Sequence, residues 1–411
     1  MRLAGVQRFV EQCLDVLWTS SPRHPARRMV AGRYRLALSH GFGGGSEVYL
    51  RANFLAPDEE SGRVTILATP RGRFVRLVAD GPGGSARGLV SQRWLVRRFV
   101  SQPASMVVLN GLPGWRPTRE LLAAVAILPP STELVLPLHD YYPVCPSFHL
   151  LDATGTYCGI PQPDVCESCF PVIVGGLASE FEDIAEWRRA WALVLRRADV
   201  VTAFSVSSVE LLKRAHSFVK PDVAAHRLPV AVQRPDYSLE RSILPRVALF
   251  GTITEIKGAN VLLEMARLAA RRGHFIEWHV FGDLYVTDVT VSLPSIKTHG
   301  RYSVVQMATL LEEYQISAAV LPSVVPETFS FVAEELASMS VPFSAFPLGA
   351  PHERLRDNPL VFFAERMTAE SLMSATLEAI EAGWHRFAPD SDSRPDPARP
   401  ASPMIRSGKR K

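Results

Sequence analysis

Short apolar runs alternate with helical patterns along most of the chain. Runs of this length, bounded by turn residues, predict buried strands, while apolar residues spaced three and four apart between them predict helices. The strands predicted in the first half are 34–39, 64–68, 106–109, 134–138 and 200–203. Those predicted in the second half are 247–250, 276–281 and 318–321. This alternation predicts an α/β protein with parallel sheets covered by helices.

The predicted elements form two series that meet near Leu228, which indicates two doubly wound, Rossmann-like domains facing each other across a cleft. The first domain is expected over 31–227, with a Cys- and Pro-rich insert at 141–172, and the second over 228–368. A helix at 369–388 is expected to return to the first domain. Residues 389–411 are rich in Pro, Ser, Asp and Arg and predict a disordered tail.

Residues 1–30 predict an amphipathic N-terminal helix, because apolar residues recur at helical spacing. These are Leu3, Val6, Val10, Leu14 and Leu17. Glu11 and Asp15 interrupt the series, which argues against a signal peptide, and no stretch reaches the ~18 apolar residues of a membrane span. We expect the helix to pack on the protein and the chain to be cytoplasmic. Basic residues near both ends leave peripheral contact with the inner face of the membrane as an alternative.

Composition supports a folded protein and gives little support for nucleic acid as a partner. Apolar residues make up 47% of the chain and charged residues 21%. The formal net charge is only +4, and the predicted folded part contains no run of Lys and Arg.

The segment after the strand 318–321 carries the strongest chemical signal. A loop containing Glu327 leads to a helix that starts near Ser330, where free backbone N–H groups can bind an anion such as a diphosphate. Glu335, further along this helix, can accept two hydrogen bonds from a ribose diol. The residues alone leave a second interpretation open, in which both glutamates are surface residues and Ser330 is only an N-cap.

The spacing of this segment resembles the E-x7-E motif of retaining GT-B glycosyltransferases of the family 4 type (glycosyl transferases group 1). The matching positions are Pro322-Ser323, Glu327, Phe329-Ser330, Glu335, Pro342 and Leu348-Gly349-Ala350. The resemblance covers most of 228–375 and, more loosely, the first half. It implies that Glu327 lies beside the transferred sugar, that Glu335 binds the ribose, and that the amides around Phe329, Ser330 and Phe331 hold the diphosphate.

A second donor-binding element follows the strand 247–250. Gly251 lets the backbone approach a ligand closely, and Lys257, at the next helix start, can neutralise phosphate. The segment resembles the strand-exit loop of the same family, which commonly carries an Arg and a Lys on the diphosphate. Lys257 matches the lysine, whereas Thr252 stands where the arginine is usual.

Two features of the first half also match the family. The glycine-rich turn with Gly44 and Gly45 lacks the spacing of a dinucleotide fingerprint, and a purely structural turn is the alternative. In GT-B enzymes this loop lies across the cleft from the donor diphosphate. His139 follows the strand 134–138, where side chains face the ligand crevice. The resemblance places a histidine beside the donor sugar there, although a lone histidine is more often structural.

Four of the five cysteines fall within the insert, in the order Cys145, Cys158, Cys166 and Cys169. A set that ends in C-x-x-C can hold a structural zinc, which we place ahead of disulfides and unligated thiols. No cluster has catalytic-metal spacing, and GT-B enzymes generally need no catalytic metal.

The sequence therefore predicts a hexosyltransferase that moves a sugar from a nucleotide-diphosphate sugar to a hydroxyl of a glycan or lipid-linked acceptor, with retention. The alternative is a non-catalytic nucleotide-binding or scaffold protein that kept the fold, for which Thr252 is the main support. A Rossmann-type oxidoreductase or epimerase would need a nicotinamide fingerprint and a Tyr-x3-Lys pair. A phosphorylase of this fold would need a pyridoxal-phosphate lysine site. Neither signature is found.

Overall fold

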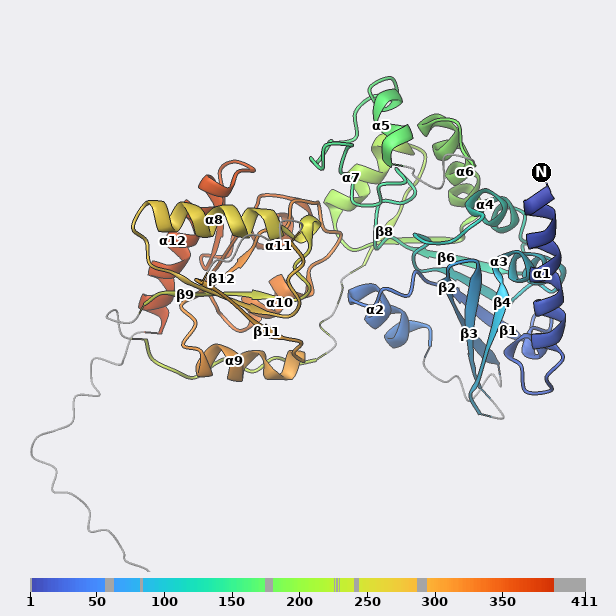
Figure 1. The fold of residues 1–411 in the computed structure, drawn as a ribbon, viewed down its shortest axis with the longest axis horizontal. Coiled ribbons are helices and arrows are strands. Elements are labelled where there is room, and N and C mark those ends of the chain that lie inside the picture. The colour runs from blue at the N-terminus through green and yellow to red at the C-terminus, as the bar shows by residue number, and fades with distance from the viewer. Residues whose placement is uncertain are drawn as a thin grey trace, which may run out of the picture.

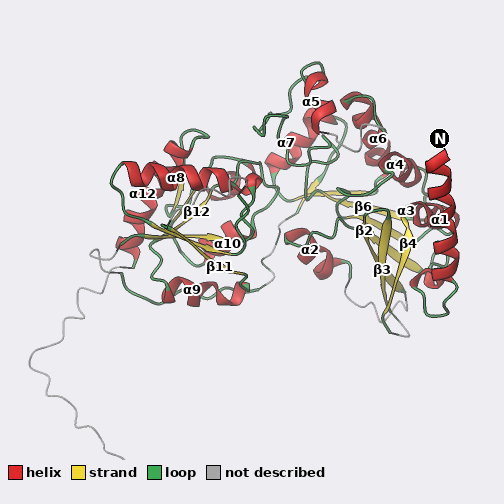
Figure 2. Ribbon diagram, in the orientation of Figure 1, coloured by secondary structure: helices red, strands yellow, loops and turns green. Residues whose placement is uncertain are grey.

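A computed structural model describes residues 2–55, 63–81, 84–173, 180–224, 226, 228, 230–239, 244–286 and 294–387, with side chains from residue 10 onward. Two separate sheets, each accompanied by helices, form two domains that lie side by side (Figure 1). Helices and strands alternate through both domains, as Figure 2 shows.

The first domain is built on an eight-stranded sheet with the order β4-β3-β2-β1-β5-β6-β7-β8. Its strands are β1 (Tyr34–Leu38), β2 (Val64–Arg71), β3 (Phe74–Asp80), β4 (Ala86–Ser91), β5 (Met106–Leu109), β6 (Glu133–Pro137), β7 (Val200–Ala203) and β8 (Asp222–Val223). Its helices are α1 (Arg2–Thr19), the 3-10 turn η1 (Pro25–Arg28), α2 (Gly45–Asn53), α3 (Gln92–Ser101), α4 (Thr118–Ala126), α5 (Cys166–Ile173), α6 (Ile184–Arg197) and α7 (Val206–Ala215).

The second domain is built on a six-stranded, all-parallel sheet with the order β11-β10-β9-β12-β13-β14. Its strands are β9 (Arg246–Phe250), β10 (Glu277–Phe281), β11 (Ile296–Gly300), β12 (Ala318–Leu321), β13 (Phe343–Ala345) and β14 (Val361–Phe363). Its helical segments are η3 (Glu255–Lys257), α8 (Ala259–Arg271), η4 (Val304–Gln306), α9 (Met307–Glu313), α10 (Phe331–Ser338), α11 (Gly349–Leu355) and α12 (Ala369–Arg386).

Both sheets reverse their strand order near the middle, between β1 and β5 in the first domain and between β9 and β12 in the second. In open α/β sheets, ligands bind in the crevice beyond the carboxyl ends of the strands at such a point. The fold prediction is confirmed: the chain is an α/β protein of two Rossmann-like domains facing each other, the GT-B arrangement.

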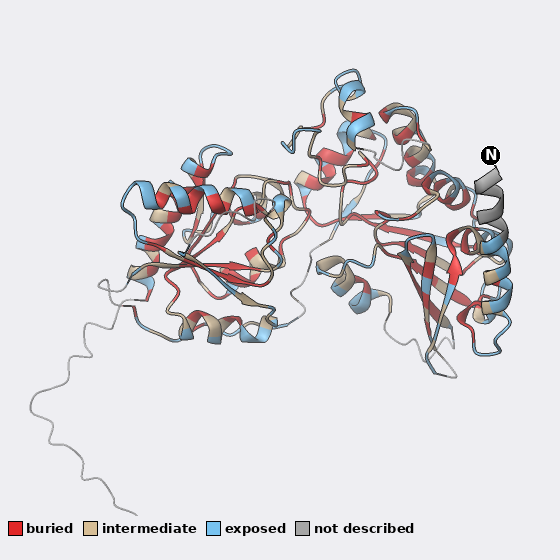
Figure 3. Ribbon diagram, in the orientation of Figure 1, coloured by how far each residue is buried: buried red, intermediate tan, exposed pale blue. Residues whose placement is uncertain are grey.

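The buried residues follow the strands of each sheet and the helix faces that cover them (Figure 3). Tyr34 and Trp115 are fully buried in the first domain, and Trp278 and Phe343 in the second. The strands read as nearly continuous apolar runs because both faces of a parallel sheet are covered. This continuity is the reason that sequence pattern located eight of the fourteen described strands.

Three strands of the first sheet, β3, β4 and β8, were not predicted. After β2 the chain turns back into β3 and β4, which pair antiparallel at the edge of the sheet. Alternation of buried and exposed residues along β3 shows that one face of this strand is covered and the other is open to solvent. This hairpin widens the first domain on the side away from the strand-order reversal.

Helix α1 packs on the protein, although Val10 and Leu17 of the predicted apolar face are exposed; the side chains of Leu3 and Val6 lie outside the described residues. The buried Asp15 carboxylate accepts hydrogen bonds from the Ser91 N–H and Ser91 hydroxyl, each at 2.6 Å, and Trp18 packs edge-on against Phe74. Leu17, expected on the packed face, is 66% exposed. The polar anchor on β4 therefore sets the rotation of the helix. Among the described residues, no helix is both long and apolar enough to cross a bilayer.

The last helix corrects the prediction that it returns to the first domain. α12 packs against α8 and the strands β12, β13 and β14 of the second domain. Its buried residues Leu372, Met373 and Ile380 belong to the core of that domain, and Figure 1 shows the helix on the second domain's far side. A Cβ on Gly383 would lie 1.7 Å from the Ser317 carbonyl oxygen, so glycine allows the helix to approach the start of β12.

Candidate active site

A pocket of about 490 Å³ lies between the domains at the carboxyl ends of their strands. The first domain contributes the loops after β1 and β6, and the second contributes the loops after β9 and β12. Nine of the eleven residues predicted for catalysis or donor binding line it: Gly45, His139, Gly251, Thr252, Lys257, Glu327, Phe329, Ser330 and Phe331. Gly44 immediately precedes α2 as its N-cap, and Glu335 is buried on α10 and does not line the pocket.

Two strand-exit loops of the second domain are held in contact. The Val324 N–H donates to the Ile256 carbonyl oxygen at 3.1 Å. Gly258 adopts a left-handed conformation with φ 82°, and a Cβ there would lie 2.0 Å from the Pro322 carbonyl oxygen. Only glycine fits this crossing without moving backbone. The crossing brings Lys257 and Glu327, 70 residues apart in the chain, to the same wall of the pocket.

Lys257 and Glu327 form an ion pair, with 2.8 Å between the Lys257 Nζ and the Glu327 Oε1. The Glu327 side chain is 12% exposed and that of Lys257 40%. The Glu327 carbonyl accepts a hydrogen bond from the Ala350 N–H at 2.9 Å, so the loop after β13 fixes the backbone of this residue. The pair places one cation and one carboxylate where a charged ligand would enter.

Helix α10 begins at the pocket with uncapped amides. Its N-cap residue is Ser330, but the Ser330 side chain makes no capping hydrogen bond. Ser330 therefore occupies the N-cap position without capping the helix through its hydroxyl. Helix α2 likewise begins at the pocket, after Gly44, without a side-chain cap. The free N–H groups and the positive dipole end of each helix favour anions.

The two helix starts approach each other closely across the domain boundary. A Cβ on Gly45 would lie 2.4 Å from the Phe331 ring, so glycine leaves the space that this ring occupies. The Thr328 hydroxyl donates to the His139 carbonyl oxygen at 3.0 Å. Glu353 of α11 accepts hydrogen bonds from the N–H groups of Val206 and Ser207 at the start of α7. These contacts hold both halves of the pocket together.

His139 lines the pocket as predicted and is a neutral imidazole. Burial, together with repulsion from His226 and His40, lowers its pKa to about 3. Its ring stacks on Phe204 and meets Tyr49 edge-on, while its Nε2 is buried without a protein partner. A buried ring nitrogen with no protein partner leaves one hydrogen bond available for a ligand.

Asp140 follows His139 into the same pocket and was not predicted. Burial raises the pKa of its carboxyl group to about 7, against the lowering effect of the hydrogen bond from the Tyr142 N–H. A carboxyl group with this pKa exchanges a proton near neutral pH, which is useful for general acid–base chemistry.

Glu335 lies on α10 and is 2% exposed. Burial raises the pKa of its carboxyl group to about 7, and no described residue donates a hydrogen bond to it. Tyr302 is close enough for the Glu335 carboxylate to raise the pKa of its phenol. The carboxyl oxygens are therefore available for the two hydroxyls of a diol.

Sequence reasoning missed three histidines of the site: His40 in the loop after β1, His149 and His226. His149 comes from the Cys-rich insert and lines the pocket. Burial and the nearby Lys257 lower its pKa to about 4, against the raising effect of Glu327. His226, in the segment between the domains, stacks on Phe329 with ring centroids 4.5 Å apart. Neither segment has a periodic pattern, so its path to the pocket follows only from tertiary packing.

The cysteine set corrects the zinc prediction. Within the part of the chain that the structure describes, no group of three or more His, Cys, Asp or Glu side chains is placed to hold a metal, and all five cysteines are free thiols. The insert is ordered by apolar packing instead, because Leu150, Ile160 and Phe170 are buried in the core of the first domain. Burial raises the pKa of the Cys145 thiol to about 12, which favours its protonated form.

No family model matches the sequence, and no curated protein matches it. Solved structures with a similar fold include sucrose-phosphate synthase from Thermosynechococcus elongatus, with 14% identity, a TM-score of 0.49 and coverage of 86% of this chain and 92% of that one. Anabaena HepE in complex with UDP-glucose has 14% identity, a TM-score of 0.47 and coverage of 86% and 95%.

TarM from S. aureus, crystallised with Fondaparinux, alpha-GlcNAc-glycerol and UDP, has 12% identity and a TM-score of 0.48. The comparison covers 77% of this chain and 59% of that one, so the chain spans less than two thirds of TarM.

Proposed function

We propose that the chain is a retaining glycosyltransferase of the family 4 type, which moves a hexose or similar sugar from a nucleotide-diphosphate sugar to a hydroxyl acceptor. The observation that carries the proposal is the convergence of two uncapped helix starts, α2 and α10, and Lys257 on one pocket between the domains. These groups supply positive potential and N–H donors without requiring a metal ion.

The donor would lie along the second domain. Its diphosphate would accept hydrogen bonds from the amides at Phe331 and Gly45 and bind Lys257, and its ribose diol would donate to Glu335. The uncapped amides, and the availability of the Glu335 oxygens, support these roles. Glu327 would lie beside the transferred sugar, together with the neutral His139.

In the reaction, the bond between the anomeric carbon and the diphosphate oxygen breaks while the acceptor oxygen forms a bond to the same carbon. The acceptor proton ends on the diphosphate, directly or through Asp140, whose pKa of about 7 suits a transient carrier. Positive groups around the diphosphate stabilise the charge that develops on it as the bond breaks. Retention, a glycan or lipid-linked acceptor, and a cytoplasmic location remain predictions of the sequence.

A nucleotide screen tests this proposal first. The melting temperature of the purified chain is measured with UDP, GDP, ADP, dTDP and CMP, and again for Glu335→Ala and for the matched control Glu378→Ala, which changes an exposed glutamate of α12. We expect one nucleoside diphosphate to stabilise the wild type and the control. At a ligand concentration 100 times Kd the stabilisation is about 2.7 kcal/mol.

The result separates the candidate functions. Stabilisation that is lost in Glu335→Ala supports the donor site and identifies the nucleotide. Binding without release or transfer of sugar from the matching nucleotide sugar favours the non-catalytic alternative. If no nucleoside diphosphate stabilises the wild type, the proposed function is wrong.

A further inference from the structure

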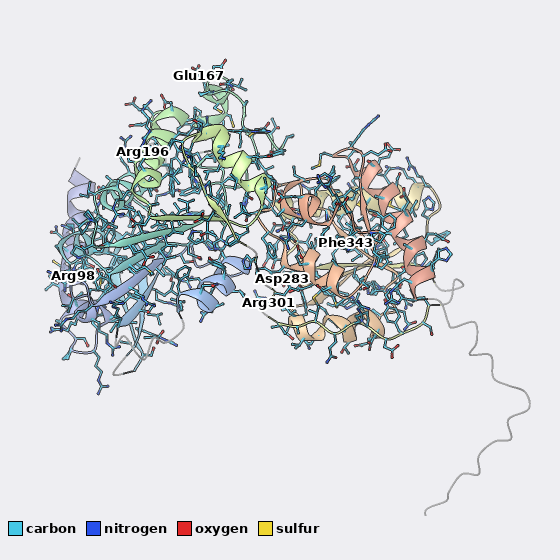
Figure 4. The ribbon with its side chains drawn as sticks, turned by 180° about the vertical axis from the view of Figure 1, so that it is seen from behind. Arg98, Glu167, Arg196, Asp283, Arg301 and Phe343 are labelled. Atoms are coloured by element: carbon cyan, nitrogen blue, oxygen red, sulfur yellow. The ribbon has the colours of Figure 1, made fainter. Side chains whose placement is uncertain are left out.

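A second cavity, of about 1340 Å³, opens on the first domain and shares no residue with the pocket between the domains. Its walls come from α6, the end of α7, the first turn of α4 and the loop 160–163. We name it the basic groove, because five arginines and one glutamate line it: Arg119, Glu186, Arg188, Arg189, Arg196 and Arg214. Figure 4 labels Arg196 on the first domain, away from the second domain.

The positive charge of the basic groove is mostly unpaired. Arg119 is neutralised by Glu186, at 2.5 Å. Arg188 and Arg214 donate to backbone carbonyl oxygens, of Val144 and Gly159, which carry no net charge. Neither these two arginines nor Arg189 and Arg196 make an ion pair with any described residue. Four like charges in one concavity raise the local concentration of anions.

The basic groove also offers apolar surface. Leu193 is 56% exposed and Phe218 is 40% exposed. The Arg196 guanidinium lies 4.3 Å from the centre of the Phe218 ring, which fixes a cation beside an accessible aromatic face. Sugar rings present apolar C–H faces together with hydroxyls and acidic groups, so a surface of this mixed kind suits an acidic sugar better than a simple anion.

Helix α7 runs from beside the pocket between the domains to the basic groove. Near its start the Ser208 hydroxyl lies 3.2 Å from the hydroxyl of Tyr141, and Tyr141 lines that pocket. The helix starts at Val206, where Glu353 of the second domain caps it, and it reaches the groove at Arg214. A helix of this length spans about 15 Å. The volume of the groove exceeds the ~300–1,000 Å³ of ordinary small-molecule pockets, and therefore suits several units of a chain.

We propose that the basic groove binds an acidic glycan, bearing carboxylate or phosphate groups, as the distal part of the acceptor. The proposal rests on the proposed function and adds the chemical class of the acceptor. The acidic groups would bind the unpaired arginines, and a sugar ring would pack on Phe218, while the growing end reaches the donor pocket about one α7 length away.

Two other polyanions fit the groove less well. An extended chain can enter a concave groove, whereas the flat surface of a membrane cannot. In addition, only two apolar side chains, Leu193 and Phe218, would be available to insert into a bilayer. Single-stranded nucleic acid is usually bound by several stacking aromatics, whereas Phe218 is the only phenyl ring among the described residues that line the groove. The net charge of +4 also gives little long-range attraction for nucleic acid.

The test measures binding of fluorescent oligogalacturonate and poly(glycerol phosphate) to the full chain, with a neutral maltooligosaccharide of similar length as the reference. The variant is the double substitution Arg189→Ala with Arg196→Ala. Its matched control is Arg76→Ala with Arg87→Ala, which removes two exposed arginines from β3 and β4 at the opposite edge of the same sheet. Nucleotide stabilisation is measured on each protein in parallel.

We expect at least one acidic probe to bind the wild type and the control, and the groove variant to bind it at least about tenfold more weakly. Added salt should weaken binding to the wild type more than to the variant, because fewer charge contacts remain to be screened. All proteins should keep the same response to nucleotide, which shows that the variant is folded and that the donor site is intact.

Several outcomes would overturn the proposal: equal binding by the groove variant, equal binding of the neutral probe, or stronger binding of oligo-dT or phosphatidylglycerol vesicles than of either acidic glycan. Loss of acidic-probe binding in the Arg76/Arg87 control would also refute the assigned location. If the glycan assay fails while nucleotide binding holds, only the groove proposal is wrong. If no nucleotide binds, the proposed function itself is wrong.

Discussion

Glu335→Gln should stabilise the protein at alkaline pH while weakening its binding of nucleotide. Glu335 is buried on α10, without a hydrogen-bond donor among the described residues, and burial raises the pKa of its carboxyl group from 4.5 to about 7. Above this pKa the folded protein must hold an uncompensated negative charge in a largely apolar setting. Glutamine keeps the size of the side chain and removes the charge.

The direction of this pH dependence follows from the number of protons that the folded and the unfolded chain bind. Between pH 4.5 and about 7 the unfolded chain has lost the proton and the folded chain retains it, so the free energy of unfolding falls as pH rises. Each pH unit corresponds to about 1.4 kcal/mol, which would give about 3 kcal/mol for the whole interval. Because the folded protein can relax around the buried charge, we expect about 2 kcal/mol of this to be observed.

Urea denaturation of wild type and Glu335→Gln at pH 8.5 and pH 5 measures this difference. The variant should be more stable by about 2 kcal/mol at pH 8.5 and by less than about 1 kcal/mol at pH 5. The control Glu378→Gln, an exposed site on α12, should stay within about 0.5 kcal/mol of wild type at both values. A gain that does not depend on pH, or a loss at pH 8.5, would refute the reasoning.

Other predictions address the remaining parts of the molecule. Lys257→Ala and Glu327→Ala should each reduce sugar transfer at least ~10-fold, because each removes an interaction worth a few kcal/mol in the transition state; wild-type turnover in either variant contradicts the assignment. Gly45→Ala should weaken nucleotide binding about tenfold through its clash with the Phe331 ring, and Phe331→Ala in the same chain should relieve the clash, as calorimetric titration can show. Asp15→Ala should lower the free energy of unfolding by about 2 kcal/mol, because the Ser91 N–H loses its buried acceptor; an unchanged urea midpoint would contradict this.

The sequence was most informative where polar, chemically active residues directly follow a regular buried strand. Buried parallel strands need apolar residues on both faces, so β9 and β12 were recognisable, and the chain must bend just beyond each of them. The polar residues at those bends, Lys257 and Glu327, consequently face one pocket. Their ion pair could not be predicted, because it depends on the crossing of two loops.

The sequence was least informative where packing sets the position of an element. The insert has no regular period, yet it carries His149 into the pocket and is ordered by residues such as Leu150. Helix α1 shows the same limit, since its orientation depends on Asp15, which pattern analysis treats as a solvent-facing interruption. Helix α12 has an apolar face that either domain could cover, and only the tertiary structure shows that the second domain does.

The absence of the usual arginine at Thr252 bears on how the site would hold a diphosphate. Lys257 is shared with Glu327, so an incoming anion must compete for this lysine, and the exposed Thr252 hydroxyl adds no charge. The remaining positive potential comes from the starts of α2 and α10, each equivalent to about half an elementary charge. The α2 contribution belongs to the other domain and reaches the ligand only when the domains are together. Diphosphate affinity in this chain should therefore depend on the contact between Gly45 and Phe331.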